Sequence, residues 1–204
     1  MGEIQKLYHD IDLFIVTFYN CDLSGISEDF NIVYFDKDFF RSISSYNRLM
    51  LNKKLYESFG LYSHMMIIQY DVSLNFRIRD LRVFTYDFVG APCYFKEKVI
   101  GLNGGYSIRN VEACKKLLES KKRFISFRKC IDSSRNVFFA LGKFVLHRSI
   151  AYWVINEDIV FSDLLGYNHK NIELYAQFSQ EKNSEYLTRT YGVPTGYHAV
   201  NKYL

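Results

Sequence analysis

The sequence HMMIIQY, residues 64–70, is a near-continuous apolar run that ends directly before Asp71. Two similar runs precede it, DLFIVT at residues 12–17 and NIVYF at residues 31–35. Apolar runs of this length are typical of strands buried on both faces of a sheet. We therefore expect these three segments to be central strands. Two further strand candidates are Asp87–Gly90 and Gly105–Arg109.

Amphipathic stretches lie between these runs. Ser44–Phe59 places Leu49, Leu55 and Phe59 near helical spacing and opens with serines that can cap a helix. Asn110–Ser120 has its apolar residues on one stripe and an asparagine at the N-cap. Alternating strands and helices predict an α/β protein. No internal repeat or linker divides residues 1–204, so we expect a single domain.

The composition is that of a globular protein with a core of its own. The chain has 204 residues, of which 49% are hydrophobic and 18% aromatic, and it contains only 2 Pro. Disordered and collagen-like classes are therefore excluded. The formal net charge of +4 does not imply nucleic-acid binding. The four cysteines are far apart and are expected to be reduced packing residues: Cys21, Cys93, Cys114 and Cys130.

The sequence contains no apolar run of about 18 residues and no N-terminal signal pattern. We expect a cytoplasmic location. One basic stretch has two interpretations, a solvated helix face or a contact with an anionic membrane surface. Its members are Lys115, Lys116, Lys121, Lys122, Arg123, Arg128 and Lys129.

Two segments near the expected strands carry candidate site residues. Asp71 follows an apolar strand, where α/β proteins place ligand and metal sites, although an aspartate there can also simply cap a turn. Gly104 and Gly105 lie in LNGGYSIR, residues 102–109, and let another group approach the backbone closely or form a tight turn. This segment lacks the dinucleotide-binding and phosphate-loop fingerprints.

Two later segments add acidic and imidazole groups. Glu157 and Asp158 stand at the start of an expected helix, as a general base and its neighbour or as an electrostatic cap. His198 lies in GVPTGYHAV, residues 192–200, as a metal ligand or a surface histidine. The residue pattern alone leaves both alternatives open.

Taken together, eight ordered segments resemble an uncharacterised bacterial family, a domain of unknown function regarded as similar to glycosyltransferases of the GT-A fold. The family order is IYQLD, YDYIGAP, GNGGFSLR, ED, A-x-x-FS-x-E and a late FH. The matching segments are FDKDFFRSISSYNRLML (35–51), YESF (56–59), MIIQYD (66–71), YDFVGAP (86–92), NGGYSIRN (103–110), NED (156–158), AQFSQE (176–181) and GYHA (196–199).

The resemblance implies a GT-A-like fold with a mostly parallel central sheet flanked by helices. By position, it makes Asp71 and His198 ligands of a divalent cation, Mn²⁺ or Mg²⁺, that holds the donor diphosphate. It also makes Asp158 the base, with Glu157 beside it. The residues that it places around the donor and the acceptor are Gln69, Tyr70, Asn103, Gly104, Gly105 and Arg109.

The chain departs from that pattern at three places. One is Val72-Ser73-Leu74-Asn75, which lacks the aromatic-rich WVF of the family. The usual acid-x-acid metal motif is Gln69-Tyr70-Asp71, which has one carboxylate. Relatives begin with an additional strand, so we expect this chain to start inside the first helix, near Ile4, and to lack the first nucleotide-binding strand. An aromatic surface that the absence of this strand leaves exposed would favour association into a homo-oligomer.

The leading hypothesis is an inverting, metal-dependent glycosyltransferase. It would move a sugar from a nucleotide-sugar donor to a bacterial glycan or lipid-linked acceptor, in peripheral contact with the inner membrane. The alternative is a non-catalytic binding or scaffold subunit of a glycan-assembly system. Binding of a donor nucleotide distinguishes these two hypotheses.

Overall fold

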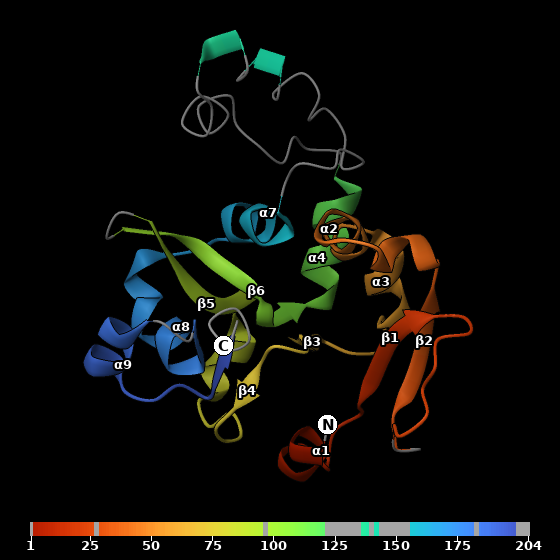
Figure 1. Ribbon diagram of the computed structural model, residues 1–204. Coiled ribbons are helices and arrows are strands. Elements are labelled where there is room, and N and C mark those ends of the chain that lie inside the picture. Colours follow the sequence, from red (N-terminus) through yellow and green to blue (C-terminus); the bar gives the residue numbers. More distant parts are fainter. Residues whose placement is uncertain are drawn as a thin grey trace.

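The computed structural model describes residues 2–26, 29–95, 98–120, 136–138, 141–142, 156–181 and 184–198. These residues form a mixed α/β structure in which the strands make small sheets, as Figure 1 shows. The predicted α/β class is confirmed at this level. In the view of Figure 1, strands β1 and β2 lie at one side and helices α8 and α9 at the other, with β5 and β6 between them.

Strands β1 (Phe14–Phe18) and β2 (Asn31–Phe35) pair in parallel, with Phe14 opposite Asn31. They follow the short helix α1 (Gly2–Leu7). Ile32 and Tyr34 are exposed, so β2 has one face in solvent. The prediction that the three apolar runs are central strands buried on both faces is therefore wrong: among the described residues, β1 and β2 form a two-stranded sheet, and His64–Ile68 is an edge strand of another sheet. An apolar run identifies the strand but not its place in a sheet.

The second sheet is antiparallel and has the order β3-β6-β5. Its strands are β3 (His64–Ile68), β5 (Phe88–Phe95) and β6 (Lys98–Asn110). Strands joined by a short hairpin must run antiparallel, because a parallel pair needs a long crossover. The expected single, mostly parallel central sheet is thus not what the described residues form. Strand β6, with thirteen residues, is the central strand because β3 and β5 pair with it on either side.

The third sheet has the order β4-β8-β7 and is mixed. Strand β8 (Gly196–His198) pairs antiparallel with β4 (Ser73–Leu74) and parallel with β7 (Ser179–Glu181). The surrounding elements are η2 (Leu81–Thr85), η3 (His169–Asn171), α8 (Ile172–Phe178) and α9 (Glu185–Tyr191). This sheet brings the C-terminal part of the chain next to the residues that follow β3.

The helix predicted over residues 44–59 is two helices. After η1 (Lys37–Phe40), α2 (Ile43–Met50) ends and α3 (Lys53–Ser58) begins within three residues. The side chain of Asn52 accepts a hydrogen bond from the Lys54 amide and caps α3. The helix predicted after Asn110 is confirmed as α4 (Val111–Glu119), with Asn110 as its N-cap.

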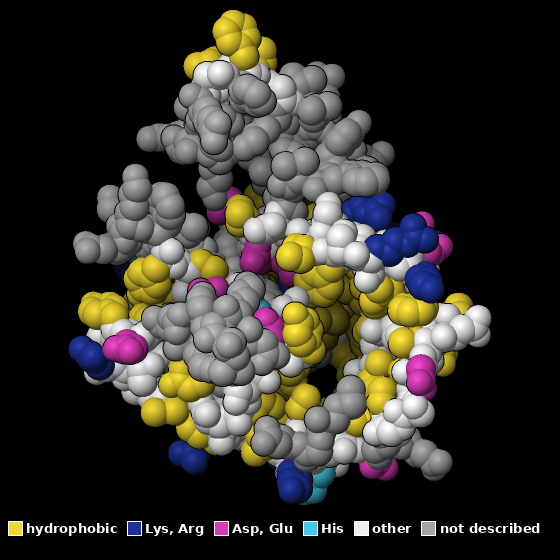
Figure 2. All heavy atoms as spheres, viewed as in Figure 1, with side chains coloured by type: hydrophobic (Ala, Val, Ile, Leu, Met, Phe, Trp, Pro, Cys, Tyr) yellow, Lys and Arg dark blue, Asp and Glu magenta, His cyan; other side chains and the backbone are white. Residues whose placement is uncertain are grey.

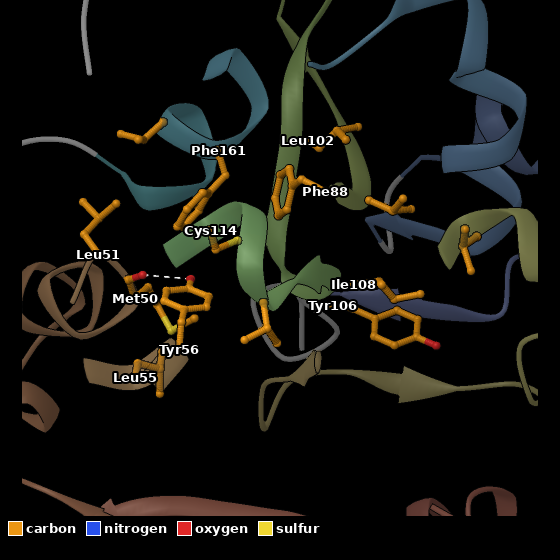
Figure 3. Packing of buried hydrophobic residues seen from close by; sticks show 14 of the residues in the cluster. Met50, Leu51, Leu55, Tyr56, Phe88, Leu102, Tyr106, Ile108, Cys114 and Phe161 are labelled. Atoms are coloured by element: carbon orange, nitrogen blue, oxygen red, sulfur yellow. Dashed lines mark hydrogen bonds between the residues drawn. The ribbon is translucent and has the colours of Figure 1, made fainter. Parts of the chain in front are cut away.

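The main hydrophobic core lies where α2, α3, α4 and α7 (Glu157–Leu164) meet the antiparallel sheet. Figure 3 shows Tyr56 among the side chains of these elements, and its hydroxyl donates a hydrogen bond to the Met50 carbonyl at 2.9 Å. Phe161 packs edge-on against Tyr56 and near Phe88. This core fixes the start of α7 relative to β6.

Several sequence predictions fall wholly or partly outside the described residues. Of the basic stretch, Lys115 and Lys116 lie on α4 and pair with Glu112, whereas residues 121–129 are not described. Cys130 is also outside, and the three described cysteines are free thiols, as expected. No described helix has the length and apolar character needed to cross a bilayer.

Candidate functional site

Four segments from different elements meet beside the middle of β6. They are residues 69–71 after β3, residues 103–105 within β6, the first turn of α7 and the last residue of β8. In the view of Figure 2, acidic side chains lie near the middle of the molecule, next to hydrophobic and uncharged polar atoms. The four segments expected to carry site residues lie together in space, because Gly104 packs against Glu157 and Gly105 packs against His198 and Gln69.

An irregularity in β6 creates the meeting point. Gly90 on β5 pairs with Ser107, but Ala91 pairs with Asn103, so the three residues between them are left out of this ladder. Such bulges redirect the residues next to them and occur often at functional sites. The Ser107 hydroxyl donates to the Gly104 carbonyl at 2.8 Å and closes the irregular segment.

A first group of side chains lies against Gly105. The Nε2 atom of His198 is 3.1 Å from Gln69 Oε1 and 3.5 Å from Asp71 Oδ1. His198 and Asp71 are 3% and 6% exposed, so this pair is held away from bulk solvent. A Cβ atom at residue 105 would overlap the His198 ring and lie 2.6 Å from Gln69 Oε1. Glycine is therefore required here for packing.

A second group lies against Gly104. A Cβ atom at residue 104 would lie 2.6 Å from Arg109 Nη2 and 2.7 Å from Glu157 Oε1. These two atoms form an ion pair at 2.9 Å, and both residues are buried. The two glycines were expected to admit a ligand or form a turn. In the structure they admit side chains of the protein itself.

Arg109 is fully buried, and all three nitrogens of its guanidinium donate hydrogen bonds within the protein. Nη2 donates to Glu157 and to the Gly104 carbonyl, Nε donates to Ser107 Oγ at 3.2 Å, and Nη1 donates to Tyr56 at 3.1 Å. Arg109 was predicted to bind donor or acceptor. Because none of its surface is exposed, it cannot contact a ligand in this conformation.

Asp158 is half-buried next to Glu157, and its Oδ1 accepts the Ile159 amide at 2.9 Å. Burial first and the negative charge of Glu157 second raise the pKa of Asp158, and the Ile159 amide and Arg109 partly offset them, so that the pKa is about 7. A carboxylate with a pKa near neutral is suited to accept a proton. The helix start predicted at Glu157–Asp158 is confirmed, but Glu157 serves as a buried ion-pair partner.

Tyr46 on α2 was missed as a site residue, although it lies within the quoted segment 35–51. Burial raises its pKa, the charge of Glu157 raises it further, and Arg109 and Gln69 lower it. Tyr46 is thus near both groups of side chains. The neighbouring Asn47 donates to Asn156 at 3.3 Å and links α2 to the start of α7.

The remaining predicted residues differ in their surroundings. Asn103 accepts the Gly105 amide at 2.8 Å and donates to Glu181 at 3.2 Å, so it fixes the glycine segment to β7. Glu181 was also missed, and its signal was the acid that ends AQFSQE. Tyr70 is 92% exposed and is the predicted site residue that projects furthest into solvent.

Asp71 and His198 were predicted to bind a divalent cation, and their geometry fits such a role. The Oδ1 atom of Asp71 is buried and has no hydrogen-bond partner among the described residues. No described cluster of three or more His, Cys, Asp or Glu side chains is arranged for a metal. Two protein ligands suffice for a hard cation only when phosphate oxygens and water complete its shell.

The family model described as "Protein of unknown function (DUF5672)" matches residues 29–198. The chain belongs to the DUF5672 family. The DUF5672 match includes every residue of the candidate site, from Tyr46 to His198. No curated protein and no solved structure matches the chain.

Proposed function

We propose that this DUF5672 protein is a glycosyltransferase that moves a sugar from a nucleotide-sugar donor to a glycan or lipid-linked acceptor. The observation that carries the proposal is the convergence of two chemically different groups beside β6. One is the Asp71–His198 pair, and the other is Asp158 with its raised pKa. A cation site close to a carboxylate base is suited to sugar transfer from a diphosphate.

The proposed chemistry assigns one role to each group. Asp158 takes the proton from an acceptor hydroxyl, whose oxygen forms a bond to the anomeric carbon of the donor sugar. The bond from that carbon to the diphosphate oxygen breaks, and the diphosphate leaves with the electron pair. Attack from the face opposite the leaving group inverts the anomeric configuration. A divalent cation, when bound, supplies charge that stabilises the leaving diphosphate.

The residues of this chain would hold the donor from one side. Asp71 and His198 offer an oxygen and a nitrogen ligand for Mn²⁺ or Mg²⁺, and Gln69 orients His198 through the 3.1 Å contact. The exposed ring of Tyr70 is adjacent and is available to stack on a base or sugar. The proposed role of Gly104 and Gly105 is to let these side chains pack close to the backbone of β6.

Nucleotide binding tests the proposal. The purified protein is heated with UDP-, GDP-, CMP- or dTDP-linked sugars, with and without Mn²⁺. A ligand at 100 times its Kd stabilises the folded state by about 2.7 kcal/mol. In a domain of this size, each kcal/mol raises Tm by about 2–4 °C. We expect one nucleotide class to raise Tm, and only with Mn²⁺.

Two variants separate binding from chemistry. Asp71→Asn is expected to remove the Mn²⁺-dependent shift, whereas Asp158→Asn is expected to keep it and abolish sugar transfer. Asp38→Asn is the matched control, because Asp38 is exposed and its carboxylate pairs with Arg41, which is not one of the site residues. If folded protein shows no shift with any nucleotide, the transferase proposal is wrong and the non-catalytic subunit becomes the better hypothesis.

A further inference from the structure

The ion pair between Arg109 and Glu157 is buried beside the site, and Glu157 uses only Oε1 in it, since Oε2 has no hydrogen-bond partner among the described residues. Its guanidinium lies between two aromatic rings, with Cζ 5.3 Å from the Phe88 centroid and 4.9 Å from the Phe161 centroid. Phe161 belongs to α7, the same helix that begins with Glu157. Arg109 therefore contacts α7 both through its charge and through a ring one turn further along.

We propose that Arg109 is a positioning residue that fixes Glu157 and the first turn of α7, and thereby sets the place and the charge state of the Asp158 carboxyl. The proposal deepens the proposed function, on which it rests for the role of Asp158 as base. Arg109 itself is fully buried and presents no surface to a donor or an acceptor.

Arg109 forms hydrogen bonds with elements on both sides of the site. Its hydrogen bond to the Gly104 carbonyl connects it to the irregular segment of β6, and its bond to Glu157 connects it to α7. Its bond to Tyr56 extends to the Met50 carbonyl at the end of α2. One planar group therefore sets the spacing of three elements. A lysine, with a single ammonium, cannot reproduce that fork.

The titratable groups around Asp158 come from α7 and the elements packed on it. The charged ones are Glu157 on α7 itself and Arg109 on β6, and the uncharged hydroxyl of Tyr46 lies on α2. The pKa of Asp158 is raised by burial first and by Glu157 second, and it is lowered by Arg109 to a smaller extent. The charge of Glu157 thus disfavours the ionised form of Asp158, and the charge of Arg109 partly offsets this effect.

The test measures the ionisation of Asp158 in the full chain, without any substrate. Carboxyl ¹³C resonances are followed against pH by NMR, and Asp158→Asn identifies the signal. In the unaltered protein the midpoint is expected near 7. In Glu157→Gln it falls by about one unit or more, because the opposing charge is removed while Arg109 stays.

A double variant keeps the inference testable if the single variant at Arg109 does not fold. Arg109→Met alone leaves the Glu157 carboxylate buried without a cation, which is strongly destabilising. Arg109→Met combined with Glu157→Gln removes both charges. Its midpoint is expected between those of Glu157→Gln and the unaltered protein, because the larger effect of Glu157 and the smaller effect of Arg109 are both lost.

The control is Arg82→Met, which removes an arginine from an exposed pair with Asp80 and should leave the Asp158 midpoint unchanged. An unchanged midpoint in Glu157→Gln and in the double variant overturns the inference, even if nucleotides bind. The expected order of midpoints in a protein that binds no nucleotide supports the effect of the pair on Asp158 while refuting the proposed function. Where transfer is measurable, its pH midpoint should follow the same order.

Discussion

Gly104 and Gly105 are adjacent in β6 but have different neighbours. Gly104 leaves room for Arg109 and Glu157, and Gly105 leaves room for His198 and Gln69. In both cases the missing Cβ atom lets buried polar side chains approach the backbone. The two residues are thus required by packing within the protein, whatever ligand the site accepts.

Replacing Gly105 by alanine tests whether packing requires glycine at this position. The new Cβ would overlap the His198 ring, which lies on the hydrogen-bonded strand β8 and cannot easily withdraw. Overpacking of this kind typically costs about 1–3 kcal/mol, so we expect a loss of that size in the free energy of unfolding. Urea denaturation measures it, together with loss of the Mn²⁺-dependent nucleotide shift.

Gly101→Ala is the matched control in the same strand. A Cβ atom there would lie 3.3 Å from the Ser162 hydroxyl, a contact that a small shift relieves. We expect a smaller loss of stability and an unchanged nucleotide shift. Equal losses in the two variants would contradict a specific role for the open space at Gly105.

At the scale of elements, α7 and β6 form the unit that carries the site. Ser162, one turn and a half after Glu157, accepts the Leu102 amide at 2.8 Å and donates to the Leu102 carbonyl at 3.1 Å. These bonds satisfy backbone groups of β6 beside its irregular segment, where the ladder to β5 changes register. Helix α7 thus supplies hydrogen bonds to the backbone of β6 beside its irregular segment.

Ser162→Ala is expected to weaken this junction. The buried Leu102 amide would lose its hydrogen-bond acceptor, and an unsatisfied buried group costs about 1–3 kcal/mol. The loss should appear in the urea-unfolding free energy, and Leu102 should exchange its amide hydrogen faster. In Ser58→Ala, where the serine is exposed on α3 and bonds only the Lys54 carbonyl, we expect a change within about 0.5 kcal/mol. A comparable effect in both variants would refute the argument.

At the scale of the whole molecule, aromatic packing connects the antiparallel sheet to the mixed one. Tyr106 on β6 stacks on Phe178 of α8, with ring centroids 4.6 Å apart. Phe178 is followed directly by β7, and Gly196 of β8 lies so close to Tyr106 that a Cβ there would be 2.8 Å from its ring. Both small sheets therefore share one hydrophobic core around these rings.

Phe178→Ala tests whether the chain folds as one unit. Removing a buried phenylalanine costs about 3–5 kcal/mol. If residues 1–204 are a single domain, denaturant should still give one transition at a lower midpoint, with coincident far- and near-ultraviolet circular dichroism. Tyr186→Ala, at an exposed ring on α9, should leave the midpoint nearly unchanged. Two separate transitions would show that the sheets unfold independently.

Local patterns in the sequence identified β1, β2, β3, β5, β6, α4 and the start of α7, but not the short strands β4, β7 and β8 or the helices α8 and α9. The run at residues 31–35 is β2 as predicted, and Asn110 begins α4 as its cap, because strand periodicity and capping act over a few neighbouring residues. The break at Asn52 was missed, since one side-chain cap competes there with an otherwise continuous helical pattern. The residues of the candidate site were likewise visible as motifs.

The arrangement of these elements depended on contacts between distant residues. The antiparallel order β3-β6-β5 and the exposed face of β2 follow from which strands pair, and neighbouring side chains do not encode that choice. The same holds for Arg109, which the motif suggested as a ligand contact. Its burial follows from the carboxylate of Glu157, 48 residues further along the chain, which lies at 2.9 Å because α7 packs on β6 and supplies the charge that a buried guanidinium needs.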